Sequence, residues 1–140
     1  MVYTALLDTS VVIDLEHIGD ERITAALGGD IGELQPAISA VTLAELAAGP
    51  HATEDPAERA VRQTRLQWAE SVFEPLPFDD DAARCYGVVY ALVRAHGRKP
   101  RGRLADLMIA SIALANGLTL LTRNPKDFTG LDTRVQVAAV

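Results

Sequence analysis

Residues 104–128 read LADLMIASIALANGLTLLTRNPKDF and contain the longest apolar stretch of the chain, residues 107–121. The pattern predicts a helix from about Leu104 to Asn116 that is apolar on almost every side and is therefore buried, with Gly117 ending it. A strand at 118–122 follows, and Asn124-Pro125 starts a short turn or helix. A buried helix that runs directly into a strand is typical of an α/β fold.

The remaining sequence alternates in the same way. We expect strands at 2–7, 37–39 and 135–140 and an extended segment at 75–78. We also expect a short helix that Thr9 or Ser10 can cap, and helices at 41–48, 56–73 and 79–95. In the helix at 56–73, Leu66 and Trp68 are expected to face the core. Strands that alternate with helices predict a mostly parallel sheet with helices on both faces.

Length and composition favour one globular domain, residues 1–140. The chain has 49% hydrophobic and 23% charged residues, and Cys85 is its single cysteine, so no internal disulfide is possible and a reducing cytoplasm is expected. The start MVYTALLD lacks the features of a secretory signal. The apolar stretch is interrupted by Asn116-Gly117 before it reaches the ~20 residues that cross a bilayer, so no membrane segment is predicted.

Four acids are expected to converge at one edge of the sheet. Asp8 and Asp127 follow predicted strands, Glu45 lies in the helix after the second strand, and Asp106 lies in the first turn of its helix. In open α/β sheets, ligands bind beyond the carboxyl ends of the strands. Because crowded carboxylates repel one another unless a cation neutralises them, the set predicts a site for a divalent cation with oxygen ligands.

Each acid also has a structural interpretation. Asp8 could cap the first helix, Asp106 could complement a helix dipole, and Asp127 could be an exposed loop acid. Glu45 could close a capping box with Thr42, unless Ser39 is the true cap. Asp8 and Asp106 are the stronger candidates because both lie in apolar segments, where burial of an unpaired carboxylate is costly.

Positive charge is concentrated next to Asp106. The net charge of −6 and the pI of about 4.9 argue against a protein with a generally basic surface. Five of the thirteen Lys and Arg residues nevertheless lie within ten positions, and we call them the basic strip: Arg94, Arg98, Lys99, Arg101 and Arg103. The strip is interpreted either as a contact for RNA phosphates or as a solvated helix end, and His96 as a surface residue at that helix end.

Three segments together resemble the PIN-domain family, and most closely the toxins of VapBC-type toxin–antitoxin pairs. They are LLDTSVVID at 6–14, AISAVTLAELAAG at 37–49 and ADLMIASIALANGLTLLTRNPKDF at 105–128. The resemblance implies a three-layer α/β/α domain that acts as a Mg²⁺- or Mn²⁺-dependent endoribonuclease. It also implies a small antitoxin that covers the acidic groove, and a homodimer built from helices.

The resemblance also implies roles for individual residues. Asp8, Glu45 and Asp106 match the first three acids of the family, and Ser10 and Thr122 match its small polar positions, which would position substrate. Asn124 stands where many relatives have Asp, so either Asn124 or Asp127 is expected to complete the metal site. Asp8 and Asp106 would bind the metal directly, and Glu45 would position or deprotonate a water.

Three other functions match parts of this pattern. A haloacid-dehalogenase-type phosphatase needs a second Asp where this chain has Ser10, and a phospho-accepting receiver domain needs a lysine after a late strand, whereas Lys99 precedes a helix. An inactive PIN-like interaction module stays open because of Asn124. The sequence does not identify the RNA that would be cut.

Overall fold

The computed structural model describes residues 2–140. Its centre is a four-stranded parallel sheet in the order β2-β1-β3-β4, formed by β1 (Ala5–Leu7), β2 (Pro36–Ala37), β3 (Thr119–Thr122) and β4 (Val137–Ala139). In the central pair, Leu6 lies opposite Leu120 and Leu7 opposite Leu121. The expected parallel sheet is confirmed, with β4 as an edge strand.

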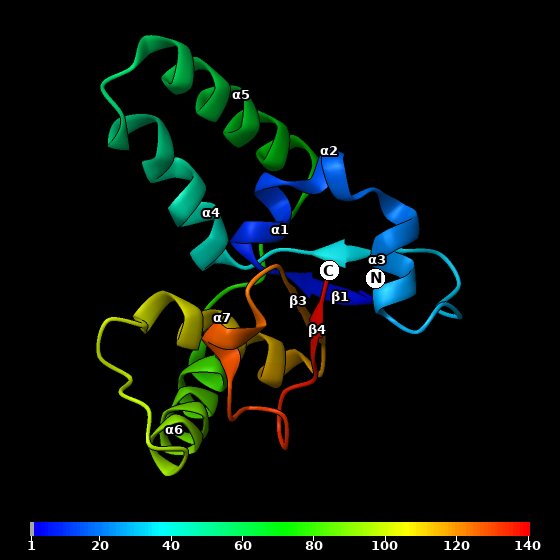
Figure 1. The fold of residues 1–140 in the computed structure, drawn as a ribbon, viewed down its shortest axis with the longest axis vertical. Helices are drawn as coiled ribbons and strands as arrows, with labels where there is room; N and C mark the ends of the chain where they lie inside the picture. The colour runs from blue at the N-terminus through cyan, green and yellow to red at the C-terminus, as the bar shows by residue number, and fades with distance from the viewer. Residues whose placement is uncertain (1) are drawn as a thin grey trace.

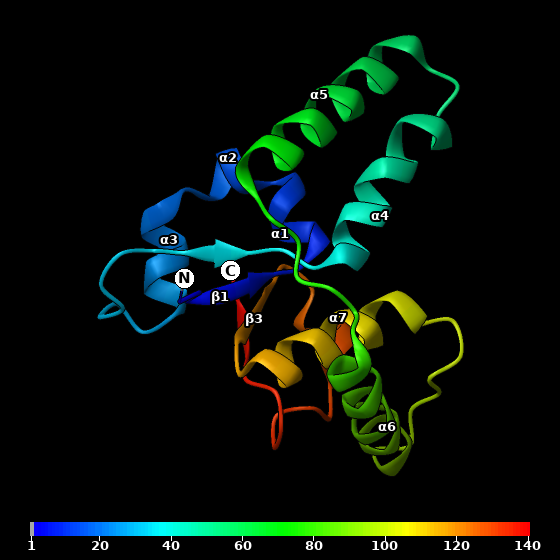
Figure 2. The ribbon, with the colours of Figure 1, turned by 180° about the vertical axis from the view of Figure 1, so that it is seen from behind.

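Helices cover both faces of the sheet (Figure 1). One face carries α1 (Thr9–Ile13), α2 (Leu15–Ile18), α3 (Asp20–Ala26), α4 (Ala40–Ala48) and α5 (Pro56–Val72); the other carries α6 (Asp80–Ala95) and α7 (Leu104–Asn116). The view from behind shows α6 and α7 side by side on their face (Figure 2). The three-layer α/β/α arrangement is therefore confirmed.

Alternation along the strands divides the core into two clusters. Leu6 and Leu120 pack with α6 and α7, while Leu7 and Leu121 pack with the helices of the opposite face. Successive strand residues point to opposite faces, so a run of apolar residues serves both layers. This explains why the strands read as continuous apolar segments.

Helix α7 matches its predicted bounds and, apart from the exposed end residues Leu104 and Asn116, its predicted burial. Leu107, Ile109 and Ala110 are fully buried, and the hydroxyl of Ser111 donates to the Leu107 carbonyl at 2.6 Å. Gly117 ends the helix in the left-handed conformation, with φ of 64°, as a C-terminal glycine does. The helix thus runs through the core and presents its first turn at the edge of the sheet.

Some expectations differ from the structure. β1, β2 and β4 are shorter than predicted, and α2 and α3 were not predicted. Residues 75–78 form only one bridge, between Leu76 and Ser39. Trp68 was wrongly expected in the core: it is 39% exposed and stacks edge-on against Phe73, while Leu66 does pack against the core. Helical spacing places Trp68 on the flank of α5 that no other element covers fully.

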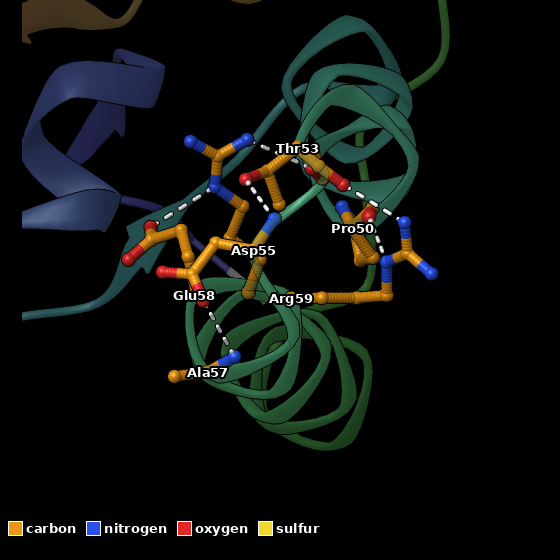
Figure 3. A network of polar contacts seen from close by, with 8 residues as sticks. Pro50, Thr53, Asp55, Ala57, Glu58 and Arg59 are labelled. Atoms are coloured by element: carbon orange, nitrogen blue, oxygen red, sulfur yellow. Dashed lines mark hydrogen bonds and ion pairs between the residues drawn. The ribbon is translucent and has the colours of Figure 1, made fainter.

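A hairpin of α4, the short 3-10 helix η1 (Gly49–Ala52) and α5 projects beyond the sheet (Figures 1 and 2). Arg59 donates to the carbonyls of Pro50 and Thr53 at 3.0 and 2.8 Å, and Asp55 caps α5 through the Ala57 N–H (Figure 3). These bonds satisfy carbonyls that η1 leaves free and hold the tip of the hairpin in one conformation. No helix in residues 2–140 has the length and apolar character needed to cross a membrane.

Candidate active site

Asp8 lies at the carboxyl end of β1, the position that the sheet topology predicts for a ligand site. It is the N-cap of α1 and only 6% exposed. Its Oδ1 accepts the Thr9 N–H at 2.9 Å, and its Oδ2 accepts the hydroxyls of Ser10 at 3.0 Å and Thr122 at 2.8 Å. Asp8 therefore does cap the helix, and at the same time it is held by three donors, which fixes its orientation.

Glu45 reaches toward Asp8 from α4. The cap of α4 is Ser39, whose Oγ accepts the Thr42 N–H at 3.0 Å, so Glu45 does not close a capping box. Instead, Glu45 accepts the Thr9 hydroxyl at 2.6 Å. The capping-box interpretation of Glu45 is thus wrong, and its carboxylate binds Thr9, the residue next to Asp8.

Asp106 lies in the first turn of α7, where the helix dipole favours a carboxylate. The pKa of Asp106 is nevertheless raised from 3.8 to about 6, mainly by burial and then by the charges of Asp127, Asp8 and Glu45, against the lowering effect of Arg103. The three acids act on Asp106 from different elements, so the fold brings them within electrostatic range of Asp106.

Asp127 has a clearer link to Asp106 than Asn124 has. Asp127 lies in the 3-10 helix η2 (Pro125–Phe128), and among the neighbouring charges its charge raises the pKa of Asp106 most. Arg103 lies 3.6 Å from its carboxylate. Asn124 is exposed, its side chain makes no cap bond, and its backbone N–H donates to the Thr122 hydroxyl at 3.0 Å.

Ser10 and Thr122 were expected to position substrate, and the structure places both hydroxyls on Asp8. Thr122 is fully buried, whereas Ser10 also accepts the Arg123 N–H at 3.2 Å. The two side chains therefore join the loop after β3 to the start of α1. Their hydroxyls orient the carboxylate of Asp8 in the present geometry.

The donor set suits a hard divalent cation that retains water. Within residues 2–140, no three Asp, Glu, His or Cys side chains lie close enough to bind one cation directly. After burial, the charges of Asp127, Asp8 and Glu45 contribute to the raised pKa of Asp106, and a cation would relieve this repulsion. Mg²⁺ commonly uses one or two carboxylates and keeps several waters, so the residues fit such an ion better than a fully protein-enclosed one.

The basic strip divides into two groups. Arg103 is bound to Asp127, and Arg98 donates to the Thr129 carbonyl at 3.3 Å. Three members of the strip are exposed: Arg94, Lys99 and Arg101. Two arginines of the strip are therefore bonded to the segment that carries Asp127, and the other three side chains are exposed.

His96 and Gly130 explain how this loop approaches α6. His96 is the exposed C-cap of α6, as expected for a surface residue at a helix end, and it lies against Gly130. A Cβ at Gly130 would lie 2.8 Å from His96 Cγ, and φ there is +94°. Only glycine fits both conditions without strain.

A separate hollow of about 680 Å³ lies between α1, α2 and α5, and we call it the α1–α5 groove. Its lining is mostly apolar and includes Val12, Ile13, Leu15, Val61 and Trp68. Ile13 is 44% and Val61 51% exposed. None of the four acids lines this groove.

Comparisons with known proteins agree with this geometry. The family model described as "PIN domain" matches residues 5–132. "Ribonuclease VapC5" of Mycobacterium tuberculosis is 37% identical over 137 residues, which cover 96% of this chain and 93% of that protein. The chain belongs to the VapC family of PIN-domain proteins. The phosphatase and receiver alternatives are therefore excluded.

Solved structures of VapC-family complexes share the whole fold. The crystal structure of VapBC-5, a toxin–antitoxin system of M. tuberculosis, matches with a TM-score of 0.74 and 32% identity over 99% of this chain and 98% of that one. VapBC2 of Rickettsia felis, bound to a DNA fragment from its promoter, matches with a TM-score of 0.75 and 25% identity over 100% and 99%.

One polar residue of the site was not singled out from the sequence. Thr9 was considered only as a cap of the first helix, yet its hydroxyl binds Glu45. The available signal was its place directly after Asp8. The expected tertiary approach of Glu45 was needed to give that place a meaning.

Proposed function

We propose that this VapC-family protein is a Mg²⁺- or Mn²⁺-dependent endoribonuclease and the toxin of a type II toxin–antitoxin pair, acting in the cytoplasm. The observation that carries the proposal is the gathering of Asp8, Glu45 and Asp127 around Asp106 at the carboxyl end of a parallel sheet. Relatives named ribonucleases with 37% and 34% identity support the reaction class.

In this proposal Asp8 and Asp106 bind the cation, and Asp127 or Asn124 completes its shell. The bound ion would supply a Lewis acid for a phosphate oxygen and an acidified water. Asp8 is already oriented by three hydrogen bonds, so little order is lost on binding. Glu45 would accept the proton of the attacking water at Oε2, since Oε1 is occupied by Thr9.

The exposed members of the basic strip would hold the RNA backbone. Lys99 and Arg101 lie on the loop between α6 and α7, a few residues before Asp106, and are free to contact phosphates. Arg98 and Arg103 would act indirectly, because their side chains are bonded to the loop of Asp127 and Thr129.

An antitoxin is expected to cover the acidic groove, and we propose that a helix of this partner also occupies the α1–α5 groove, which none of the four acids lines. The VapBC complexes to which the fold is similar contain such a partner. Exposed Ile13, Val61 and Trp68 provide an apolar surface that one helix of a partner could cover. We further propose a homodimer built from helices of the protein.

The deciding experiment is cleavage of total cellular RNA by the purified, partner-free protein. Mg²⁺ or Mn²⁺ should give discrete fragments, and EDTA should abolish them. The Asp106→Asn variant should bind RNA but cleave it at least about 100-fold more slowly, because a ligand of the ion is lost. Asp132→Asn, at an exposed loop acid, is the matched control.

Two outcomes would reject the proposal. Cleavage that survives EDTA and Asp106→Asn would indicate a contaminating nuclease. Absence of cleavage with intact Mn²⁺ binding would indicate an inactive PIN-like interaction module.

A DNA-binding antitoxin encoded by the neighbouring gene would distinguish a toxin from a housekeeping nuclease.

A further inference from the structure

Four polar groups form a continuous hydrogen-bonded chain that ends at Glu45. Thr9 Oγ1 lies 2.6 Å from Glu45 Oε1 and 3.0 Å from Thr42 Oγ1, and Thr42 Oγ1 lies 3.3 Å from Ser39 Oγ. Ser39 and Thr42 are fully buried. The chain therefore runs from the buried N-terminus of α4 to a carboxylate at the surface of the site.

The direction of the chain follows from its chemistry. An ionised carboxylate only accepts, so the single hydroxyl proton of Thr9 goes to Glu45. Thr42 must then donate to Thr9, and Ser39 to Thr42. The Ser39 Oγ in turn accepts the Thr42 N–H at 3.0 Å, which ties the inner end of the chain to the cap of α4.

Thr9 binds two acids at once. Its N–H donates to Asp8 Oδ1 at 2.9 Å, and its hydroxyl donates to Glu45 Oε1 at 2.6 Å. Glu45 is exposed and carries a flexible side chain, and within residues 2–140 its carboxylate has this one hydrogen-bond partner. The position of the Glu45 carboxylate relative to Asp8 thus depends on one residue.

We propose that Thr9 is a positioning residue that holds the Glu45 carboxylate at a fixed place beside Asp8. The inference rests on the proposed function for its catalytic consequence, but not for its effect on cation binding. Thr9 touches neither RNA nor the reacting atoms in this role. Its hydroxyl restricts Glu45, while Thr42 and Ser39 continue the hydrogen-bonded chain into the buried N-terminus of α4.

Thr9→Val tests the role because valine has nearly the shape of threonine and keeps the backbone N–H that binds Asp8. We expect Mn²⁺ binding to the metal-free protein, measured by calorimetry, to weaken about 10-fold or more, as is usual when an outer-shell hydrogen bond of a metal site is lost. The kcat for RNA should fall about 10- to 100-fold, with KM within about twofold. Thr9→Ser should restore both values to within about threefold.

Thr42→Val is the matched control for a merely structural effect. It removes the next hydroxyl of the chain and leaves the bond between Thr9 and Glu45 in place. We expect it to lower the free energy of unfolding at least as much as Thr9→Val, but to change Mn²⁺ affinity less than about threefold. In a Glu45→Gln background, Thr9→Val should have little additional effect on Mn²⁺ affinity.

The results separate this inference from the proposed function. If the wild type cleaves RNA and Thr9→Val matches it in Mn²⁺ affinity and kcat, the role of Thr9 is wrong and the proposed function stands. If the wild type cleaves no RNA, but Thr9→Val weakens Mn²⁺ binding and Thr9→Ser restores it, the role stands and the proposed function fails. Equal effects of Thr42→Val and Thr9→Val, or no Mn²⁺ binding by the wild type, would overturn the role.

Discussion

The hydroxyl of Thr122 donates to Asp8 Oδ2 at 2.8 Å across a sequence separation of 114 residues. Thr122 ends β3 and Asp8 follows β1, and these two strands are neighbours in the sheet. The bond is buried at both ends. Parallel pairing therefore gives Asp8 a donor that no local segment supplies.

Thr122→Val should lower the free energy of unfolding by about 1.5–3 kcal/mol, because a buried carboxylate loses a hydrogen bond. Urea unfolding in EDTA measures this change. Thr122→Ser keeps the hydroxyl and should cost less, and Thr133→Val, at an exposed loop position, should cost almost nothing. A value for Thr122→Val within about 0.5 kcal/mol of the wild type would contradict the role of this bond.

Stability in EDTA should depend on the ionisation of Asp106. Because its pKa is raised from 3.8 to about 6, the folded protein binds this proton more tightly than the unfolded chain does. Asp106 therefore lowers stability as the pH rises from about 4 to about 6. The stability of Asp106→Asn relative to wild type should be higher at about pH 7.5 than at about pH 4, as urea unfolding at both pH values would show.

The stabilisation of the protein by Mn²⁺ should increase with pH, whereas the contribution of Asp106 to stability in EDTA decreases. Asp106 must be ionised to bind a cation, so the increase in Tm caused by Mn²⁺ should be large at about pH 7.5 and small at about pH 5. Asp106→Asn should show little increase at either pH. An equal increase in the variant would exclude Asp106 from the metal site.

Asp127 and Asn124 can be separated by substitution. Asp127→Asn removes the charge that raises the pKa of Asp106 most, so this pKa should fall toward its ordinary value. Mn²⁺ affinity should drop several-fold. Asn124→Ala should leave the pKa of Asp106 unchanged and alter Mn²⁺ affinity by less than about twofold, since the Asn124 side chain is exposed and makes no cap bond. Carboxyl-carbon NMR titration and calorimetry would measure the two effects, and the reverse ranking would assign the fourth ligand to Asn124.

The two groups within the basic strip should behave differently. Lys99→Glu with Arg101→Glu should weaken binding of single-stranded RNA and reduce the slope of log K against log salt by about 1.4, at about 0.7 per phosphate contact. Arg103→Gln should instead weaken Mn²⁺ binding by releasing Asp127. Filter binding over a salt series measures the first effect, and an unchanged slope would show that the exposed residues are solvated only.

The single tryptophan reports on the α1–α5 groove. Trp68 is 39% exposed and lines this groove, so a bound partner should shift its emission to shorter wavelength and protect it from iodide. Val61→Glu should weaken binding of the neighbouring gene product at least about tenfold, whereas Val2→Glu, outside the groove, should not. Full iodide quenching of Trp68 in the complex would place the partner elsewhere.

The sequence by itself determined much of the fold, because the signals are local. The apolar residues of 104–121 specify a buried helix followed by a buried strand, and Gly117 marks the junction. The short helices after α1 were missed since their few apolar residues, such as Ile18 and Ile23, form no extended periodic pattern. Both side chains are buried in the core cluster that also contains Leu7 of β1 and Leu121 of β3.

For the candidate site, the sequence predicted which acids share one edge of the sheet but not which groups bind them. Residue type and the order of strands predicted that Asp8, Glu45 and Asp106 would share one edge of the sheet. Only the tertiary structure decided which groups hold them: Thr122 on Asp8, Thr9 on Glu45, and Arg103 on Asp127. Side-chain hydrogen bonds and ion pairs depend on ångström-scale distances between segments, and local sequence patterns do not encode those distances.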